Sequence, residues 1–130
     1  MNISVAAEKS GVPAKTIRYY ESIGLIEEPS RTEGGYRDYG ERDIAVLSFV
    51  QRARGLGFPI RDVSALLSLW HDRGRASAQV KDLTQRHIGE IERRIEELQA
   101  VRRTLLDLAD KCHGDTRPDC PIIADLAGQK

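Results

Sequence analysis

Long apolar runs are missing from this 130-residue chain. No segment approaches the roughly 20 consecutive apolar residues that a membrane-spanning helix needs. The N-terminal segment MNISVAAEKSG has neither the basic start nor the apolar core of a signal peptide. We therefore expect a cytoplasmic protein with no membrane partner.

An excess of charge is missing as well, because 20 lysine and arginine residues balance 20 aspartate and glutamate residues. Bulk charge therefore does not favour nucleic acid, and any case for DNA must rest on where individual cations lie. The chain also lacks a nucleophile–base constellation, a phosphate-binding loop and paired catalytic carboxylates. These absences predict that the protein is not an enzyme.

Cysteine is scarce too, with only Cys112 and Cys120 in the whole chain. Thiols stay reduced in the cytoplasm, so a structural disulfide is disfavoured there. A close pair of cysteines then favours a metal site or a redox site.

Two short helical segments open the chain. The segment SVAAEKSGV has Ser4 as a candidate N-cap and Gly11 as a turn residue. In PAKTIRYYESIGL, which follows at once, Pro13 suits a first helical turn and Gly24 suits a helix end. Two short helices joined by a glycine-containing turn predict a helix-turn-helix.

The next segment, IEEPSRTEGGYRDYG, carries the signals of a small β-hairpin, or wing. Pro29 and the Gly34–Gly35 pair mark turns, and Tyr36 and Tyr39 favour extended backbone. Two connecting helices should follow, because apolar residues then recur at helical spacing. These residues are Ile44, Leu47, Val50 and Ala53 in the first helix and Val63, Leu66, Leu67 and Trp70 in the second.

The stretch from Ala78 to Ala109 contains no proline and carries one apolar stripe. Its members, at spacings of three or four typical of a coiled coil, are Ile88, Ile91, Ile95, Leu98, Val101, Leu105 and Leu108. Such a helix would extend about 40 Å, too far to hide the stripe against a small N-terminal domain. The pattern predicts a homodimer, and packing within one chain is disfavoured because little sequence remains to cover the stripe.

Cations and aromatic residues gather on the predicted helix-turn-helix and wing. If Ile17, Tyr20 and Ile23 face the core, the outer side of the second helix holds Lys15, Thr16, Arg18 and Tyr19. Side chains early in such a helix reach the major groove, where lysine and arginine pair with phosphates or guanine edges. The wing adds Arg31, Tyr36 and Arg37, which could clamp the DNA backbone. Each alone is an ordinary surface residue, but their joint placement predicts a DNA-binding surface.

Three motifs, TIRYYESIGLI, GYRDYGERDI and ARGLGFPIRDV, closely resemble the MerR family of winged-helix transcription regulators. The resemblance covers the N-terminal half. It implies a mainly α fold with a winged helix-turn-helix domain in residues 1–75, an antiparallel dimerisation helix in 76–110, and a metal-binding loop with a short helix in 111–130.

The same resemblance implies a homodimer on promoter DNA with an inverted repeat. In such a promoter the spacer between the two promoter elements is too long. The resemblance implies that this spacer is untwisted when the effector binds, so that RNA polymerase engages both elements. Residue by residue, Lys15 and Arg18 resemble recognition-helix contacts, and Tyr36 and Arg37 resemble wing contacts to phosphate.

The loop CHGDTRPDC contains Gly114 and Pro118, so it can fold back on itself. A helix starting near Pro121 would stabilise negative charge at Cys120. Structural zinc normally takes four ligands, yet only His113 lies nearby as a further soft or borderline ligand. Two thiolates suit Cu(I) better, because this soft ion tolerates low coordination.

The segment CHGDTRPDCPII resembles the metal-binding loop of the copper-responsive, CueR-like branch of the family. That resemblance implies that Cys112 and Cys120 hold one Cu(I), Ag(I) or Au(I). Zinc- and lead-sensing relatives have a further cysteine where this chain has Ser77, which implies selectivity for monovalent ions. His113 stands where this branch commonly has proline, and it is either a third ligand or directed to solvent, as we expect.

The expected function is activation of metal-efflux or detoxification promoters in response to copper. One alternative is a zinc or redox sensor of the same family, in which His113 or a disulfide replaces Cu(I). Another is a cytosolic copper carrier, which would leave the wing and the recognition helix without a purpose.

Overall fold

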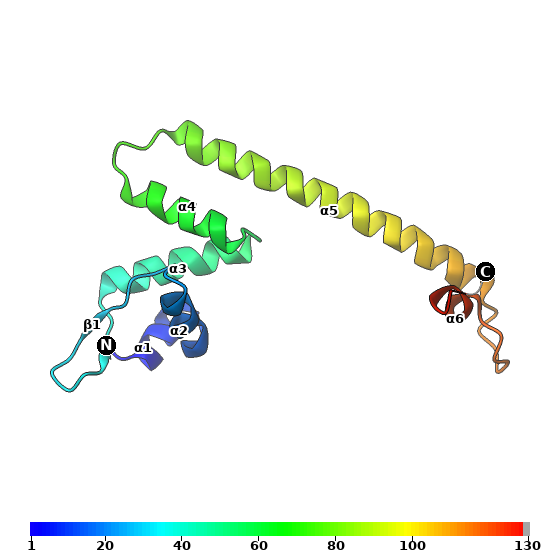
Figure 1. Cartoon of the computed structure of the whole chain (residues 1–130), viewed down its shortest axis with the longest axis horizontal. Coiled ribbons are helices and arrows are strands. Elements are labelled where there is room, and N and C mark those ends of the chain that lie inside the picture. The colour runs from blue at the N-terminus through cyan, green and yellow to red at the C-terminus, as the bar shows by residue number, and fades with distance from the viewer. Residues whose placement is uncertain (129–130) are drawn as a thin grey trace. The chain divides into compact units, whose positions relative to one another are not determined.

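A computed structural model describes residues 1–128 and is mainly helical, with one small β-hairpin (Figure 1). In chain order the elements are α1 (Ile3–Ser10), α2 (Ala14–Ser22), β1 (Ser30–Arg31), β2 (Arg37–Asp38), α3 (Glu41–Gly55), α4 (Ile60–His71), α5 (Ser77–Lys111) and α6 (Pro121–Leu126). This order confirms the expected fold class. Gln129 and Lys130, the end of the expected 111–130 segment, lie outside the described residues.

The chain forms two compact units, residues 1–83 and the residues from 84 onward. The core of the first unit is built where α1 packs on α2 and α3, and α3 packs on α4. Its most enclosed side chains are Val12, Ile17, Leu47, Val50 and Val63. Each such side chain contributes roughly 1.5–3 kcal/mol by leaving water.

The first helix begins two residues earlier than expected. Asn2 is the N-cap, because its side-chain oxygen accepts a hydrogen bond from the Val5 N–H at 2.9 Å. The prediction of Ser4 as N-cap is therefore wrong, since Ser4 already lies in the first helical turn. The turn at Gly11 is confirmed by its left-handed backbone, with φ at 78°.

The second helix buries Ile17 and Tyr20, as expected, but it leaves Ile23 43% exposed. Ile23 is the C-cap, and Gly24 then turns the chain with φ at 74°. Because α2 has ended, Ile23 no longer follows its buried face, and Leu25 and Ile26 enter the core instead. The expectation for Ile23 was wrong for this reason.

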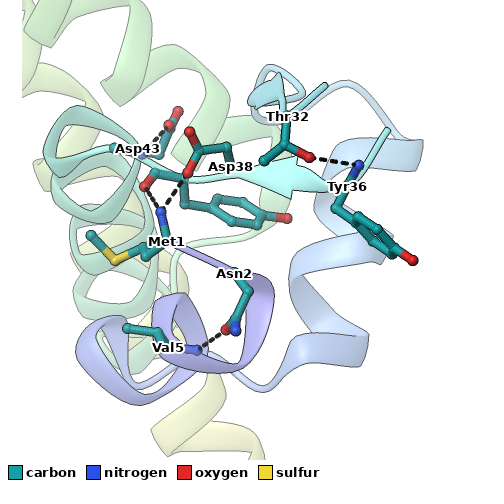
Figure 2. A network of polar contacts seen from close by, with 9 residues as sticks. Met1, Asn2, Val5, Thr32, Tyr36, Asp38 and Asp43 are labelled. Atoms are coloured by element: carbon teal, nitrogen blue, oxygen red, sulfur yellow. Dashed lines mark hydrogen bonds and ion pairs between the residues drawn. The ribbon is translucent and has the colours of Figure 1, made fainter. Parts of the chain in front are cut away.

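The wing is an antiparallel pair in which Ser30 faces Asp38 and Arg31 faces Arg37. Thr32 closes the turn of the wing, because its N–H donates to the Tyr36 carbonyl at 2.8 Å. Its hydroxyl also accepts from the Tyr36 N–H at 3.3 Å (Figure 2). At its base, the Met1 ammonium group donates to Asp38 at 2.6 Å and to the Tyr39 carbonyl at 2.9 Å. These contacts fasten the wing to the start of α1.

Helix α5 is a single helix of 35 residues with an uncovered apolar stripe. Ile88, Ile91, Ile95, Leu98, Val101 and Leu105 are 42–60% exposed. No apolar side chain is buried in the described residues 84–128, so this unit has no core of its own. An apolar stripe of this length marks an interaction surface.

No helix within residues 1–128 combines the length and apolar character needed to cross a membrane.

The Ile95→Asp variant would test whether this stripe pairs two chains. A carboxylate buried in that interface without a partner should cost several kcal/mol, so the variant should be monomeric. Sedimentation velocity would measure the change in mass.

Arg93→Asp is the matched control. Two residues correspond to about 200° of helical rotation, so this variant places the same carboxylate on the other side of α5 and should stay dimeric. An Ile95→Asp protein that remains dimeric at every concentration would exclude the stripe as the interface.

Candidate DNA-binding surface and thiol pair

Helix α2 presents three of its four candidate DNA contacts to solvent. Because Ile17 and Tyr20 face the core, Lys15, Arg18 and Tyr19 lie on the outer side, and Tyr19 is 54% exposed. Thr16 is only half-buried, at the edge of this face. The exposed side of α2 therefore carries two cations and a phenol, a set suited to phosphates and base edges.

The wing presents Tyr36, which at 76% exposure is among the most open aromatic side chains of the described residues. Arg31 is exposed as well, and one of its terminal nitrogens donates to the Gly35 carbonyl at 2.9 Å. Arg31 thus braces the wing turn and still offers further N–H donors.

Arg37 differs from the other wing cation because it pairs inside the protein. Its Nε donates to Oε2 of Glu21 at 3.0 Å, and its side chain is only 27% exposed. Glu21, on α2, is buried to 1% side-chain exposure. A second donor reaches the same carboxylate, because the Tyr39 hydroxyl lies 2.8 Å from Oε1.

Burial raises the pKa of Tyr39 well above its ordinary value, and the hydrogen bond to the Glu21 carboxylate raises it further. The phenol therefore stays protonated and remains a donor at neutral pH. Sequence reasoning missed Glu21. The signal for its burial was present in the sequence, because Glu21 lies four residues after Ile17 and so on the same buried face of the helix.

The two cysteines come together in the second unit. Cys112 directly follows α5, Cys120 is the N-cap of α6, and their Sγ atoms lie 3.7 Å apart. The loop between them turns at Gly114, with φ at 65°, and its tip is clipped by Arg117 bound to Asp115 at 2.7 Å. The Arg117 guanidinium also holds the pKa of Asp115 below its usual value.

The backbone N–H of Ile123, at the start of α6, lowers the pKa of Cys120, with smaller contributions from Ile122 and Cys112. This favours the thiolate, the form that binds metals. A zinc–thiolate bond is about 2.3 Å long, so one ion with bonds of that length can contact two sulfurs up to about 4.6 Å apart. The pair at 3.7 Å meets that condition.

His113 is exposed, and the described residues hold no group of three or more histidine, cysteine or acidic side chains arranged to share a metal. Ser77 is also exposed and is the first residue of α5. Within the described residues, the metal-binding atoms brought together at this loop are therefore the two sulfurs of Cys112 and Cys120.

Two family profiles match this chain, a MerR helix-turn-helix regulatory protein over residues 1–70 and a MerR DNA-binding family over residues 44–108. The chain belongs to the MerR family. The resemblance found in its motifs is thereby confirmed, and so is the helix-turn-helix.

Individual MerR-family proteins match nearly the whole chain. Heavy metal-dependent transcription regulator 2 of Rhizobium meliloti is 54% identical over 98% of this chain and 86% of its own length. The transcriptional regulator CueR of Salmonella typhimurium is 45% identical over 98% and 93%. These relatives are transcription regulators, which confirms the expectation that the chain is not an enzyme.

A solved MerR-family structure extends the comparison to three dimensions. The transcription regulator PbrR691 from Ralstonia metallidurans CH34, in complex with lead(II), superposes with a TM-score of 0.83. It is 32% identical and covers 97% of this chain and 98% of its own. The fold described above is thus similar to that of a solved transcription regulator over 97% of the chain.

The Arg18→Ala variant would test the exposed face of α2. If Arg18 reaches a phosphate or a base edge, operator affinity should fall about tenfold or more. The dependence of log affinity on log salt should flatten by about 1 for each phosphate that the variant no longer neutralises. Fluorescence anisotropy at several salt concentrations measures both quantities.

Arg52→Ala, an exposed arginine on α3, is the control and should bind the operator like the wild type. An equal reduction in affinity for Arg18→Ala and Arg52→Ala would mean that overall charge matters and that the face of α2 does not.

Proposed function

We propose that this MerR-family chain is a cytoplasmic, copper(I)-responsive activator of metal-efflux or detoxification promoters. It would bind an inverted-repeat promoter as a homodimer, and Ag(I) or Au(I) could replace Cu(I). Metal binding would distort the promoter spacer so that RNA polymerase engages both promoter elements. The observation that carries the proposal is the half-buried pair of sulfurs 3.7 Å apart, formed by Cys112 and Cys120.

Ligand number supports a monovalent soft ion. Two thiolates satisfy Cu(I), whereas zinc normally takes four ligands and would need water or a partner residue to complete its shell. Charge alone does not decide the matter, because two thiolates are neutral with a divalent ion and carry one negative charge with a monovalent ion. The heavy-metal relative and the lead-bound structure support metal sensing in general.

The location of the sulfurs supports a switch. Cys112 and Cys120 join the end of α5 to the start of α6, so an ion held by both fixes the direction in which α6 leaves the loop. Ile123 and Leu126 on α6 are 64% and 76% exposed, which gives this helix an apolar face to dock. Metal would then bias two DNA-bound conformations only through its preference for one of them.

Ser77 would enter this site through a partner chain. It begins α5, whereas Cys112 follows the last residue of the same helix. If two α5 helices pair antiparallel, as the family resemblance implies, the first turn of one helix lies beside the cysteine loop of the other. Residue 77 then decides whether a third soft ligand is available.

A redox sensor is the second candidate, and the sulfur separation is what favours it. To form a disulfide the sulfurs would move from 3.7 Å to about 2.05 Å apart. The two thiols would lose two protons and two electrons to an oxidant such as a peroxide, whose O–O bond breaks as it is reduced to water or an alcohol. Zinc bound with the help of His113 is the remaining sensor candidate. A copper carrier would give no role to the exposed cations of α2 and the wing.

Metal specificity is the central test. Run-off transcription in a reducing buffer, at defined free Cu(I), Ag(I), Zn²⁺ and Hg²⁺, should show activation by Cu(I) and Ag(I). Cys112→Ser and Cys120→Ser should each abolish this activation, because a hydroxyl does not replace a soft thiolate, while operator affinity stays within about twofold.

His113→Ala is the matched variant in the same loop and should respond to Cu(I) like the wild type. If Zn²⁺ activates the wild type as strongly as Cu(I) does, the two-thiolate model is wrong and His113 becomes the first residue to test as a third ligand.

The role of Ser77 gives a separate prediction. Ser77→Cys should add a soft ligand and raise the response to divalent ions such as Zn²⁺, measured as the ratio of Zn²⁺-induced to Cu(I)-induced transcript. Ala78→Cys, whose thiol lies about 100° further around α5, should leave that ratio unchanged. A ratio that rises equally in both variants would show that residue 77 does not face the metal loop.

A further inference from the structure

We infer that Glu21 is the positioning residue that holds the wing cation Arg37 in place for a DNA phosphate. The inference rests on the DNA-binding surface proposed for α2 and the wing. Glu21 lies on α2, Arg37 on β2, and the Nε–Oε2 distance of 3.0 Å joins the two elements that this surface comprises.

The carboxylate is held from two sides. Arg37 donates to Oε2, and the Tyr39 hydroxyl donates to Oε1 at 2.8 Å. Tyr39 is itself fastened, because its backbone N–H donates to the Met1 carbonyl at 2.7 Å and its carbonyl accepts from the Met1 ammonium group. Glu21 therefore has a fixed position, and it transmits that position to the guanidinium.

The geometry leaves Arg37 able to bind a second anion. A guanidinium has five N–H donors, and Nε uses one of them on Glu21. The two terminal nitrogens keep the planar fork that matches two oxygens of a phosphate. Because Nε is held by Glu21, the two terminal nitrogens of Arg37 point in a defined direction. The Arg37 side chain therefore loses less conformational freedom when DNA binds.

The negative charge of Glu21 cannot itself favour DNA binding, so we infer that this carboxylate serves to position Arg37. Glu21 neutralises Arg37, so the pair adds no net charge to the surface, and an acidic group near DNA opposes binding. Removing the charge alone would therefore tighten DNA binding, whereas losing the position of Arg37 would weaken it. The two effects have opposite signs, which makes the role of Glu21 measurable.

The test uses Glu21→Gln in the full-length protein with operator DNA, titrated by anisotropy from low to high salt. Positioning predicts affinity about tenfold weaker and a salt slope flatter by about 1 per protomer, although Arg37 is intact. Glu33→Gln, an exposed carboxylate in the wing turn, removes the same charge and should bind equally well or more tightly. Thermal melts by circular dichroism set a temperature at which every variant is folded.

Two further variants keep the inference testable if Glu21→Gln does not fold. Glu21→Asp keeps the charge but shortens the side chain by one methylene group, so it cannot reach both donors and should also weaken binding. In an Arg37→Ala background, Glu21→Gln should not weaken binding further and should tighten it slightly, because the residue that it positions is gone and only the effect of the lost negative charge remains. Wild-type affinity and slope in Glu21→Gln or Glu21→Asp, with weak binding by Arg37→Ala, would overturn the positioning role. Wild-type binding by Arg37→Ala would instead overturn the proposed wing contact itself.

Discussion

A helix of 35 residues with an uncovered apolar stripe is the constraint on which the second half of the chain depends. In water, helical stability comes mainly from packing an apolar face, and the described residues 84–128 bury no apolar side chain of their own. We propose that the surface that covers the stripe comes from another polypeptide. Because the stripe has the spacing of a coiled-coil seam, a second copy of the same helix is the complement that fits it best.

The balance of charges is the constraint on the DNA-binding half. With no net charge, any preference for DNA depends on where individual cations lie, and the exposed ones are Lys15 and Arg18 on α2 and Arg31 on the wing. Burying Glu21 beneath this surface would be costly unless its charge were paired, and Arg37 and Tyr39 supply two donors to it. One carboxylate thus joins the helix and the wing.

Local patterns allowed much of this fold to be predicted from the sequence. The spacing of apolar residues predicted the helices, because this periodicity depends only on the sequence of each segment. Gly11 and Gly24 predicted turns, because both turn positions have a positive φ that glycine adopts readily. Ser4 and Ile23 were misjudged at helix ends, where one capping hydrogen bond or one residue of extra length decides the outcome. The Glu21–Arg37 pair could not be read from the sequence, since 16 residues separate its members and only the folded hairpin joins them.

The thiol pair was the more predictable site, because both sulfurs lie in one short loop whose turn residues are visible in the sequence. The choice of metal is less predictable, because two sulfur ligands favour a soft ion but do not determine how many further ligands complete its coordination. In an antiparallel pair of α5 helices, the neighbour that completes or fails to complete the shell comes from the partner. Covering the apolar stripe and choosing the metal would then be consequences of one interface, in which a serine at position 77 would keep the ligand count at two. A metal that needs more than two ligands would gain less binding free energy from the closed loop. Its preference for the closed conformation would be weaker, so it would shift the equilibrium between the two conformations less.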